Sequence, residues 1–516
     1  MVAAGHPQTA EVGAAVLREG GNAADAAIAA VCASFVAESP LTGFGAGGFM
    51  LVHRDGESSL LDFFVETPGR DSDGVRAELI PVDILFDGTI QTFNTGAASC
   101  GVPGTPAGLA EAITTFGTLD LAEVVAPAAR MAREGVAVTP GQAYLHEVLE
   151  PILTATPEAQ ELYAPHGRLL RAGDRFRWIE LADTLARYGA EGSGLFADGD
   201  VGRALSAWVL QRGGEVGVAD LQAYRPIARD PVRARFAGRE ILTNAPPSSG
   251  GILIAFALEL LERVGGHGIA ELVGVMEEAN ASRHDEFHRS LYDPAFARWY
   301  LESGRLDAAA DRVRARLRTG APPLARSAGP GDQLGSTTHI AVVDADGMAV
   351  SVTCSNGSGS AVVVPGTGVH MNNMLGEEDL SPHGFHTLPA GVRMTSMMAP
   401  TLILRDGAVE AALGSAGSNR LRSAIVQTAC HMVIDGLSPQ QAIDAGRVHT
   451  EAGVVHAEPG VDPSGLAAVE ARGFEINRWQ RRNLFFGGAQ AVRRKADGSK
   501  LQGGGDPRRG GAAETA

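Results

Sequence analysis

A polar strand start inside an apolar hairpin is the feature that most constrains this chain. Residues 333–357 read QLGSTTHIAVVDADGMAVSVTCSNG. Asp346 and Gly347 are typical of a two-residue hairpin turn, because a type I′ turn needs positive φ at both positions. The apolar runs on either side of this turn predict two paired strands. The polar start of the first strand is what needs an explanation.

The predicted turn determines which residues face each other across the hairpin. Thr337 then faces Asn356, and Thr338 faces Ser355. Directly opposed Cβ atoms in such a pair lie ~4.5–5.5 Å apart. Hydroxyl and amide side chains therefore gather at the open end of the hairpin. A slip of one residue would change the pairs but not this clustering.

Threonine is a common strand residue, so strand propensity alone is one explanation for Thr337. The alternative is chemical. Residues 320–336 are rich in proline and glycine, which predicts an exposed, flexible linker that runs directly into the strand. A threonine hydroxyl needs a base beside it, and its own α-amine, with a pKa of ~7.7–8.0, can serve once the chain is cut before it. This pattern suggests a self-processing hydrolase with Thr337 as a new N-terminus.

Composition excludes other classes of function. The formal net charge is −17, whereas nucleic acid and anionic lipid surfaces require a basic footprint. Cys32, Cys100, Cys354 and Cys430 are far apart and form no CxxC pair, so we expect buried thiols and neither disulfides nor a zinc site. The sequence predicts a protein that acts on small molecules, without metal or cofactor.

The two ends of the chain give two further expectations. No signal peptide is visible at the start, and no apolar run reaches the ~18 residues that span a bilayer. This predicts a cytoplasmic protein without a membrane span, or an extracytoplasmic one if the true start lies upstream. The tail beyond about Arg509 is polar and glycine-rich, which predicts disorder.

Eight sequence blocks resemble those of the γ-glutamyltranspeptidase family (γ-glutamyltransferases), and they occur in that family's order. They are EGGNAADAAIA, GAGGFMLV, GVPGTPAG, PPSSGG, STTHIAVVDADGMAVSVT, RMTSMMAPTL, GSAGSNR and DPRRGG. The resemblance spans nearly the whole chain, from Met1 to about Gly510. One block alone would be weak evidence, whereas eight in order are strong.

The resemblance implies an N-terminal-nucleophile hydrolase that is made as a precursor and cuts itself. The cut would fall between Ser336 and Thr337. It would give a large-subunit part, residues 1–336, which ends in the linker, and a small-subunit part, residues 337–516. Both parts would fold together as one α/β domain, an αββα four-layer sandwich with two packed sheets between helices.

The resemblance also implies a catalytic set. Thr337 would be the nucleophile both for the cut and for catalysis, and Ser355 stands where the family has a second threonine that hydrogen-bonds it. Gly417 and Ser418 match a Gly-Gly pair whose backbone N–H groups form the oxyanion hole. That role needs only N–H groups, so Ser418 can serve if its φ and ψ permit.

Several substrate contacts follow from the same resemblance. Asn356 matches, with a one-residue length difference, an asparagine that holds the substrate. Thr395 and Ser396 match a Ser-Ser pair that holds the glutamyl α-carboxylate. Taken singly, each of these can also be an ordinary strand or loop residue. The family's aspartate for the substrate α-amine falls among three acidic residues, with the first as the best match: Glu377, Glu378 and Asp379.

One departure from the family concerns the substrate α-carboxylate. The family clamps this group with an arginine in a DFRE stretch, whereas this chain reads DFFVETPGR, with Phe64 at that place. A phenyl ring cannot replace a guanidinium fork. Either Arg70 or Arg393 supplies the missing charge, or the acyl group lacks the carboxylate.

Three functions remain open. The first is hydrolysis of γ-glutamyl amides such as glutathione, or γ-glutamyl transfer to amino acids and peptides. The second is the same threonine chemistry on a different acyl or amide substrate. The third, a non-catalytic homologue that serves as a binding protein, has little support because Thr337, Asn356 and Gly417 are present. This third function predicts that Thr337→Ala changes no activity in cells.

Overall fold

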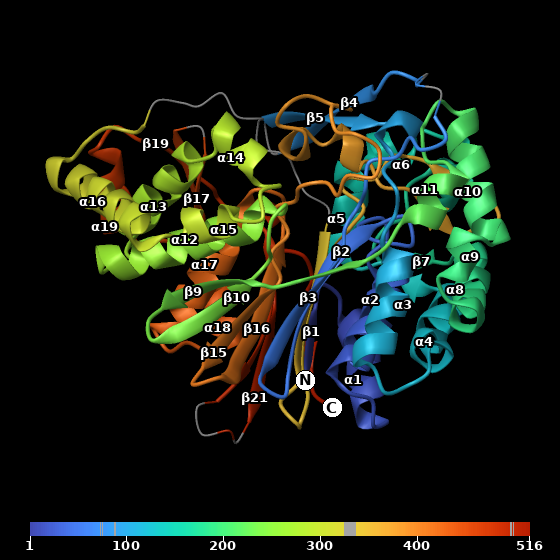
Figure 1. Cartoon of the computed structure of the whole chain (residues 1–516), viewed down its shortest axis with the longest axis horizontal. Helices are drawn as coiled ribbons and strands as arrows, with labels where there is room; N and C mark the ends of the chain where they lie inside the picture. Colours follow the sequence, from blue (N-terminus) through green and yellow to red (C-terminus); the bar gives the residue numbers. More distant parts are fainter. Residues whose placement is uncertain are drawn as a thin grey trace.

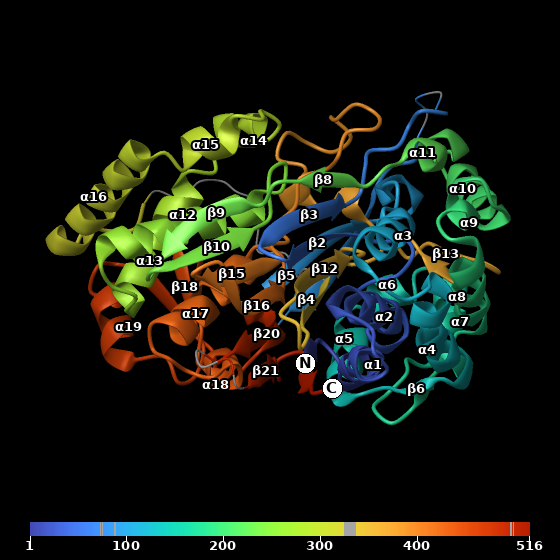
Figure 2. The same cartoon turned by 60° about the horizontal axis from the view of Figure 1, so that its bottom comes forward.

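Two β-sheets pack face to face at the centre of the molecule, and helices cover both outer faces (Figures 1 and 2). This computed structural model describes residues 1–516 apart from 73, 75, 87–88, 325–336, 452, 496–497 and 499. The arrangement confirms the predicted αββα sandwich. Among the described residues, no helix is long and apolar enough to cross a membrane.

The first sheet has seven strands, in the order β22-β1-β11-β12-β2-β3-β8. The predicted hairpin, β11 with β12, lies in its middle, and every residue of both strands is buried. The seven strands are β1 (Val2–Ala4), β2 (Gly47–Arg54), β3 (Glu57–Phe63), β8 (Ile227–Arg229), β11 (Thr337–Val343), β12 (Ala349–Ser355) and β22 (Ala512–Glu514).

The second sheet has six strands, in the order β21-β20-β16-β15-β10-β9. They are β9 (Val232–Phe236), β10 (Arg239–Thr243), β15 (Thr401–Arg405), β16 (Ala408–Ala416), β20 (Gly488–Arg494) and β21 (Leu501–Gly505). On its outer side lie α12 (Ser249–Val264), α13 (Ile269–Ala281), α16 (Ser303–Thr319), α17 (Arg420–Val433), α18 (Pro439–Asp444) and α19 (Pro463–Glu470).

Helices near the N-terminus cover the outer face of the first sheet (Figure 1). The main ones are α1 (Pro7–Arg18), α2 (Ala23–Ala37), α3 (Thr105–Phe116), α4 (Leu121–Glu134), α8 (Ile179–Glu191) and α10 (Asp200–Gln211). A separate hairpin, β4 (Ile80–Phe86) with β5 (Thr89–Thr95), and the short helix α14 (Asp285–Ser290) lie along one end of the sandwich.

The Ala-rich helix α2 is buried along its whole length, as the absence of a polar face predicts. Asn22 caps its start by accepting hydrogen bonds from the N–H groups of Ala24 and Asp25, which confirms the cap expected for that residue type. Its C-terminal cap is Glu38. The helix thus delivers a carboxylate into the buried layer beside the first sheet.

Residues along β11 alternate between two hydrophobic cores. Ile340 belongs to the core between the first sheet and its helices, and Ala341 belongs to the core that includes the second sheet. Because successive side chains in a strand point to opposite faces, Thr337 faces the second sheet and Thr338 faces α2. All four cysteines are free and buried, as predicted.

The predicted pairing within the hairpin is wrong by one residue. Thr337 pairs with Ser355, and Thr338 pairs with Cys354, so Asn356 lies just beyond the ladder. The clustering of polar groups at the open end survives this slip, as expected.

The slip arises in the loop that joins β11 to β12. Of the predicted turn pair, Gly347 has a positive φ of 96°, but Asp346 does not. Asp344 explains the difference, because its Oδ1 accepts from the Met348 N–H at 2.9 Å and its Oδ2 accepts from the Ala23 N–H at 3.0 Å. This carboxylate closes a three-residue loop and ties it to the start of α2.

The predicted disorder of the C-terminal tail is also wrong. Residues Ala512–Glu514 form β22, which pairs antiparallel with β1 at the edge of the first sheet. The flexible linker predicted for residues 320–336 lies mostly outside the described residues.

Candidate active site

Thr337 lies at the first position of β11 and is 5% exposed. Its Oγ1 donates a hydrogen bond to Ser355 Oγ at 3.1 Å, and Ser355 Oγ accepts another from the Gly357 N–H at 3.0 Å. A serine hydroxyl is not a base near neutral pH, so Ser355 orients the threonine oxygen but does not activate it. Because Ser336 lies outside the described residues, the cut before Thr337 remains a prediction.

A cavity of about 420 Å³, here called the Thr337 cavity, opens beside this hydroxyl. Its wall combines apolar side chains with a few polar ones, as small-molecule sites do. Its lining consists of Phe64, Thr337, Ser355, Gly357, Met374, Glu377, Asp379, Leu380, Ser396, Met397, Met398, Ser418 and Leu421.

The lining of the Thr337 cavity, all of it within the described residues, contains no arginine, lysine or histidine. Phe64 takes part in the wall and stacks on Phe49 with 5.3 Å between ring centroids. Arg70 is not in the wall, because its guanidinium is paired with Asp220 at 3.3 Å and with Glu66 at 3.7 Å. This cavity therefore offers no cationic side chain to a substrate carboxylate.

Arg393 is buried, and its two terminal nitrogens hold the chain around Phe64. Its Nη1 donates to the Phe64 carbonyl at 2.9 Å and to Asp62 Oδ1 at 3.2 Å, and its Nη2 donates to Glu66 Oε1 at 3.0 Å. The guanidinium also stacks over the Tyr224 ring at 4.6 Å. Arg393 thus positions the backbone that carries Phe64 and does not face the cavity.

Two of the three acidic candidates line the cavity. Glu377 and Asp379 do, whereas the half-buried Glu378 does not. Burial raises the pKa of Glu377 to about 7, with a further contribution from the nearby Asp379. One oxygen of Glu377, Oε1, accepts from the Ser358 N–H at 3.3 Å. Glu377 is therefore the carboxylate best placed to meet a substrate amine.

Asp379 is committed to a different contact. Its Oδ2 accepts from Ser418 Oγ at 2.8 Å and its Oδ1 accepts from Asn419 Nδ2 at 3.0 Å. Burial raises the pKa of Asp379 to about 6. Both oxygens are thus used to hold the turn that joins β16 to α17.

That turn contains the candidate oxyanion residues. Gly417 and Ser418 have φ values of 125° and 50°, and a left-handed serine is strained and persists only when its surroundings hold it. The bond from Ser418 to Asp379 supplies that fixation. The turn places Ser418 in the cavity wall, in the same lining as Thr337.

The remaining predicted contacts fall in three different places. Ser396 lines the Thr337 cavity, whereas its neighbour Thr395 lines an adjoining one. Asn356 lines neither, and its side-chain nitrogen donates to the carbonyls of Pro40 and His370 at 3.4 and 3.3 Å. In this structure Asn356 therefore connects the loop after β12 to two other segments of the chain and does not line a cavity wall near Thr337.

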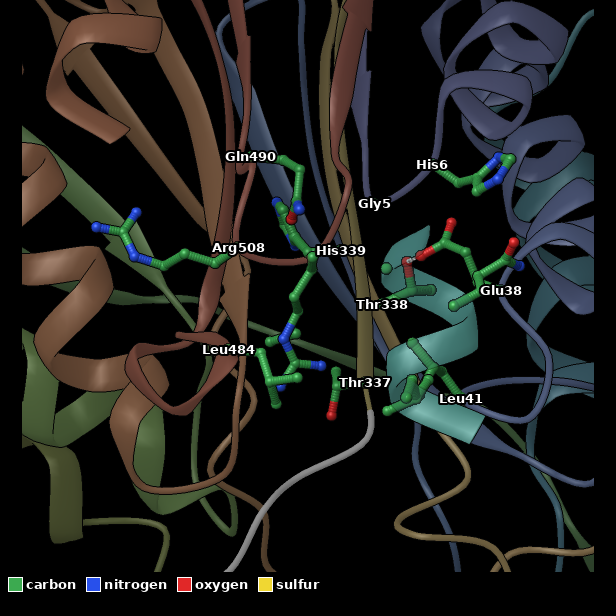
Figure 3. Close-up of a pocket in the computed structure, with 15 residues that line it drawn as sticks. Gly5, His6, Glu38, Leu41, Thr337, Thr338, His339, Leu484, Gln490 and Arg508 are labelled. Atoms are coloured by element: carbon green, nitrogen blue, oxygen red, sulfur yellow. Dashed lines mark hydrogen bonds between the residues drawn. The ribbon is translucent and has the colours of Figure 1, made fainter. Parts of the chain in front are cut away.

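A further cavity, of about 530 Å³, lies at the start of β11 and is called the Glu38 cavity (Figure 3). Thr337 lines both this cavity and the Thr337 cavity. Figure 3 shows Glu38 directed at Thr338, whose Oγ1 donates to it at 2.5 Å, while Thr9 Oγ1 donates at 2.8 Å. Burial raises the pKa of Glu38 to about 7. Glu38 therefore anchors the residue that follows the candidate nucleophile.

Sequence reasoning did not identify Glu38, and it included Thr338 only as a member of the hydroxyl cluster. One signal was available, because Glu38 follows an Ala-rich helix, and a carboxylate at a helix C-terminus is opposed by the helix dipole. A glutamate at this unfavourable position indicates that other partners stabilise its carboxylate. Here the partners are the two threonine hydroxyls that donate to it.

This chain is similar to one family model and to several known proteins. The family model described as Gamma-glutamyltranspeptidase matches residues 9–516. The Acylase ACY 1 proenzyme of Pseudomonas sp. (strain SE83) is 33% identical over 516 residues, covering 97% of this chain and 90% of that protein. The Glutathione hydrolase proenzyme of Escherichia coli (strain K12) is 28% identical over 532 residues, covering 98% and 90%.

A solved structure agrees with these relatives. The crystal structure of cephalosporin acylase from Bacillus halodurans matches with a TM-score of 0.83 and 28% identity, over 100% of this chain and 96% of that one. Sequence blocks, fold and family match all point the same way, and we conclude that the chain belongs to the gamma-glutamyltranspeptidase family.

Proposed function

We propose that this protein is a self-cleaving threonine amidase and acyltransferase whose acyl donor lacks an α-carboxylate. The observation that carries this proposal is the cavity itself. It brings the Thr337 hydroxyl together with Ser418 and Glu377, and it has a phenyl ring where the family has an arginine. Two relatives named acylase proenzyme, both 33% identical to this chain, support the same direction.

The proposed cut leaves both fragments in one body. Strand β11 would begin the small fragment, yet it pairs with β1 of the large fragment on one side and with β12 of the small fragment on the other. Strand β12 in turn pairs with β2 of the large fragment. Hydrogen-bonded ladders and two shared cores therefore hold the fragments together after cleavage.

The proposed reaction needs no group beyond those of the chain. Thr337 Oγ attacks the amide carbonyl carbon, and its proton passes to the freed α-amine of Thr337. The carbonyl oxygen becomes an oxyanion held by the N–H groups of Gly417 and Ser418. The C–N bond then breaks, the α-ammonium returns the proton to the leaving amine, and an acyl ester remains on Thr337.

The second half of the reaction repeats these steps with a new nucleophile. Water or an acceptor amine attacks the ester carbonyl and gives its proton to the α-amine of Thr337. The ester C–O bond breaks and the proton returns to Thr337 Oγ. Water yields a carboxylic acid, and an amine yields a new amide.

A second candidate, γ-glutamyl amide turnover, is favoured by one observation. Glu377 lines the cavity and can pair with the α-ammonium of a γ-glutamyl group. Glu377 and Asp379, the two carboxylates of the cavity wall, disfavour the α-carboxylate of a γ-glutamyl group, because like charges placed together cost several kcal/mol. The two candidates therefore differ in the group they recognise on the acyl chain.

Four p-nitroanilides separate these candidates by adding one charge at a time. γ-Glutamyl carries both the ammonium and the carboxylate, 4-aminobutanoyl carries only the ammonium, glutaryl carries only the carboxylate, and butanoyl carries neither. We expect kcat/KM to be highest for 4-aminobutanoyl and lowest for glutaryl. Thr337→Ala protein gives the blank rate for each compound.

The outcome that would reject the proposed acyl preference is equally specific. If γ-glutamyl-p-nitroanilide is turned over faster than the 4-aminobutanoyl compound, the carboxylate is recognised and the γ-glutamyl candidate stands. If the self-cleaved protein turns over none of the four, short-chain amidase activity is rejected for this protein.

A further inference from the structure

A third cavity, of about 460 Å³, adjoins the Thr337 cavity and is called the distal cavity. Leu380 lines both. Two chain segments, residues 374–380 and 394–398, divide their side chains between the two cavities. In each segment neighbours point to different sides: Met374 and Ser396 line the Thr337 cavity, and Leu375 and Thr395 line the distal cavity.

The wall of the distal cavity is mainly apolar. Its aliphatic members are Leu291, Leu375, Leu380, Pro382, Leu388 and Met394. Tyr292 is 42% exposed although it is a large aromatic residue, and its hydroxyl is tied to the Arg393 carbonyl at 3.1 Å. An apolar pocket with a fixed aromatic side chain in its wall is suited to a hydrocarbon chain or ring.

Three polar atoms around this apolar wall lack a hydrogen-bond partner within the described part of the chain. They are Thr395 Oγ1, His288 Nδ1 and His386 Nε2, and all three are buried atoms. Thr395 itself is 4% exposed. A buried polar atom without a partner is unfavourable, so three of them around one cavity indicate a ligand that supplies the missing bonds.

The charge of the cavity wall restricts that ligand. The lining, all of it described, contains three histidines but no aspartate, glutamate, lysine or arginine. Burial lowers the pKa of His288 to about 4, and burial also lowers the pKa of His386, so both rings are neutral at pH 7. A charged group would find no counter-ion here, whereas a neutral donor or acceptor would find three partners.

We propose that the distal cavity extends the acyl site and binds the remote end of a long, mainly apolar acyl chain that ends in a neutral hydrogen-bonding group. An amide, a carbonyl or a hydroxyl has this chemistry. The inference rests on the proposed function, because the acyl carbonyl must lie at Thr337. From there the acyl chain of the substrate passes Phe64 and reaches Leu380, the residue common to both cavities.

Acyl p-nitroanilides of increasing length test this extension on the self-cleaved protein. Butanoyl is the short reference, heptanoyl adds apolar length, and 6-carbamoylhexanoyl and 6-carboxyhexanoyl add a neutral or a charged end. We expect kcat/KM for heptanoyl to exceed that for butanoyl at least ~10-fold, from the burial of three more methylenes. The carbamoyl compound is expected to be better still, and the carboxyl compound worse than heptanoyl.

Two variants connect this preference to the cavity. Thr395→Val keeps the shape of the side chain and removes its hydroxyl, so it is expected to lower the preference for carbamoyl over heptanoyl ~5- to 10-fold, about one hydrogen bond. His386→Asn tests the contribution of the imidazole in the loop that carries His386, because it removes the ring, and Asn tolerates the left-handed φ of 56° at this position. Thr115→Val, on the exposed surface of α3, is the matched control and is expected to leave the preference unchanged.

The outcomes distinguish this inference from the proposed function. If butanoyl is turned over but longer chains bring no gain, the cavity holds only water and the inference is wrong while the proposed function stands. If Thr395→Val lowers kcat/KM equally for both long substrates, the threonine has a structural role only, which also overturns the inference. If no compound is turned over, the proposed function itself fails.

Discussion

Asp379→Ala is expected to slow catalysis far more than it weakens substrate binding. Asp379 accepts hydrogen bonds from Ser418 Oγ at 2.8 Å and from Asn419 Nδ2 at 3.0 Å, and both bonds fix the turn with two successive positive φ values. Alanine leaves both donors without this acceptor. The turn that carries the proposed oxyanion N–H groups then loses its support.

The magnitude follows from these two bonds. Hydrogen bonds to a charged group contribute about 1.5–3 kcal/mol each, so the two together exceed the strain of about 1–3 kcal/mol in a left-handed serine. If the released turn withdraws one oxyanion donor, kcat falls about 10²- to 10³-fold. We therefore expect Asp379→Ala to lower kcat by about 10²-fold and to change KM by less than about 3-fold.

Asp379→Asn is the matched variant. Its amide can accept from Asn419 and donate to Ser418, so both contacts persist as neutral hydrogen bonds. We expect its kcat to fall by no more than about 10-fold, since only the charge assistance is lost. The assay is kcat and KM at pH 8, where a carboxyl with a pKa of about 6 is ionised in the parent protein.

A double-mutant cycle isolates the contact. In a Ser418→Gly background the bond between Ser418 and Asp379 is already absent. The effect of Asp379→Ala on kcat should therefore be smaller there than in the parent protein. The reasoning is refuted if Asp379→Ala raises KM more than about 10-fold with kcat unchanged. That result would make Asp379 a substrate-binding carboxylate, as one of the alternatives from the sequence allowed.

Three other predictions concern the neighbourhood of Thr337. Ser355→Ala removes the acceptor of the Thr337 hydroxyl, so self-cleavage and kcat should both fall about 10-fold, measured by gel time course and by turnover. Glu38→Gln should stabilise the fold by about 3 kcal/mol at pH 8 but not near pH 4. The pKa of Glu38 rises on folding from 4.5 to about 7, so the folded protein binds the proton more tightly, and the stability of the parent protein falls as the pH rises from 4.5 to about 7. Urea unfolding at pH 4 and pH 8 measures this effect. Equal changes in stability at the two pH values would contradict it. Arg393→Met leaves Asp62 buried without one of its cations and should cost about 3–5 kcal/mol in the same assay, whereas a loss below about 1 kcal/mol would contradict its structural role.

Local signals in the sequence predict the strand pairs, whereas the four layers were expected only from the family resemblance. Apolar runs and Asp-Gly turns identify strand pairs, and two such turns, at 55–56 and 406–407, do have positive φ at both residues. The third, at 346–347, does not. Its geometry is decided by Asp344, whose second oxygen is bound by Ala23, more than three hundred positions away. No local pattern carries that information.

The same limit applies to the charged residues of the site. From the sequence, Arg70 and Arg393 are equal candidates for a substrate carboxylate. In the structure, each is engaged by acids that lie far along the chain, Asp220 for the first and Asp62 for the second. The C-terminal strand was missed for a related reason, since small residues become a strand only when β1 offers an edge to pair with.

The role of Thr337 as nucleophile is tested by the mass and N-terminal sequence of the purified protein on incubation. We expect two fragments, residues 1–336 and 337–516, with the smaller one beginning at Thr337, and a Thr337→Ala variant that stays a single chain of 53.5 kDa. A parent protein that remains one chain, or a fragment that begins at any other residue, would contradict it.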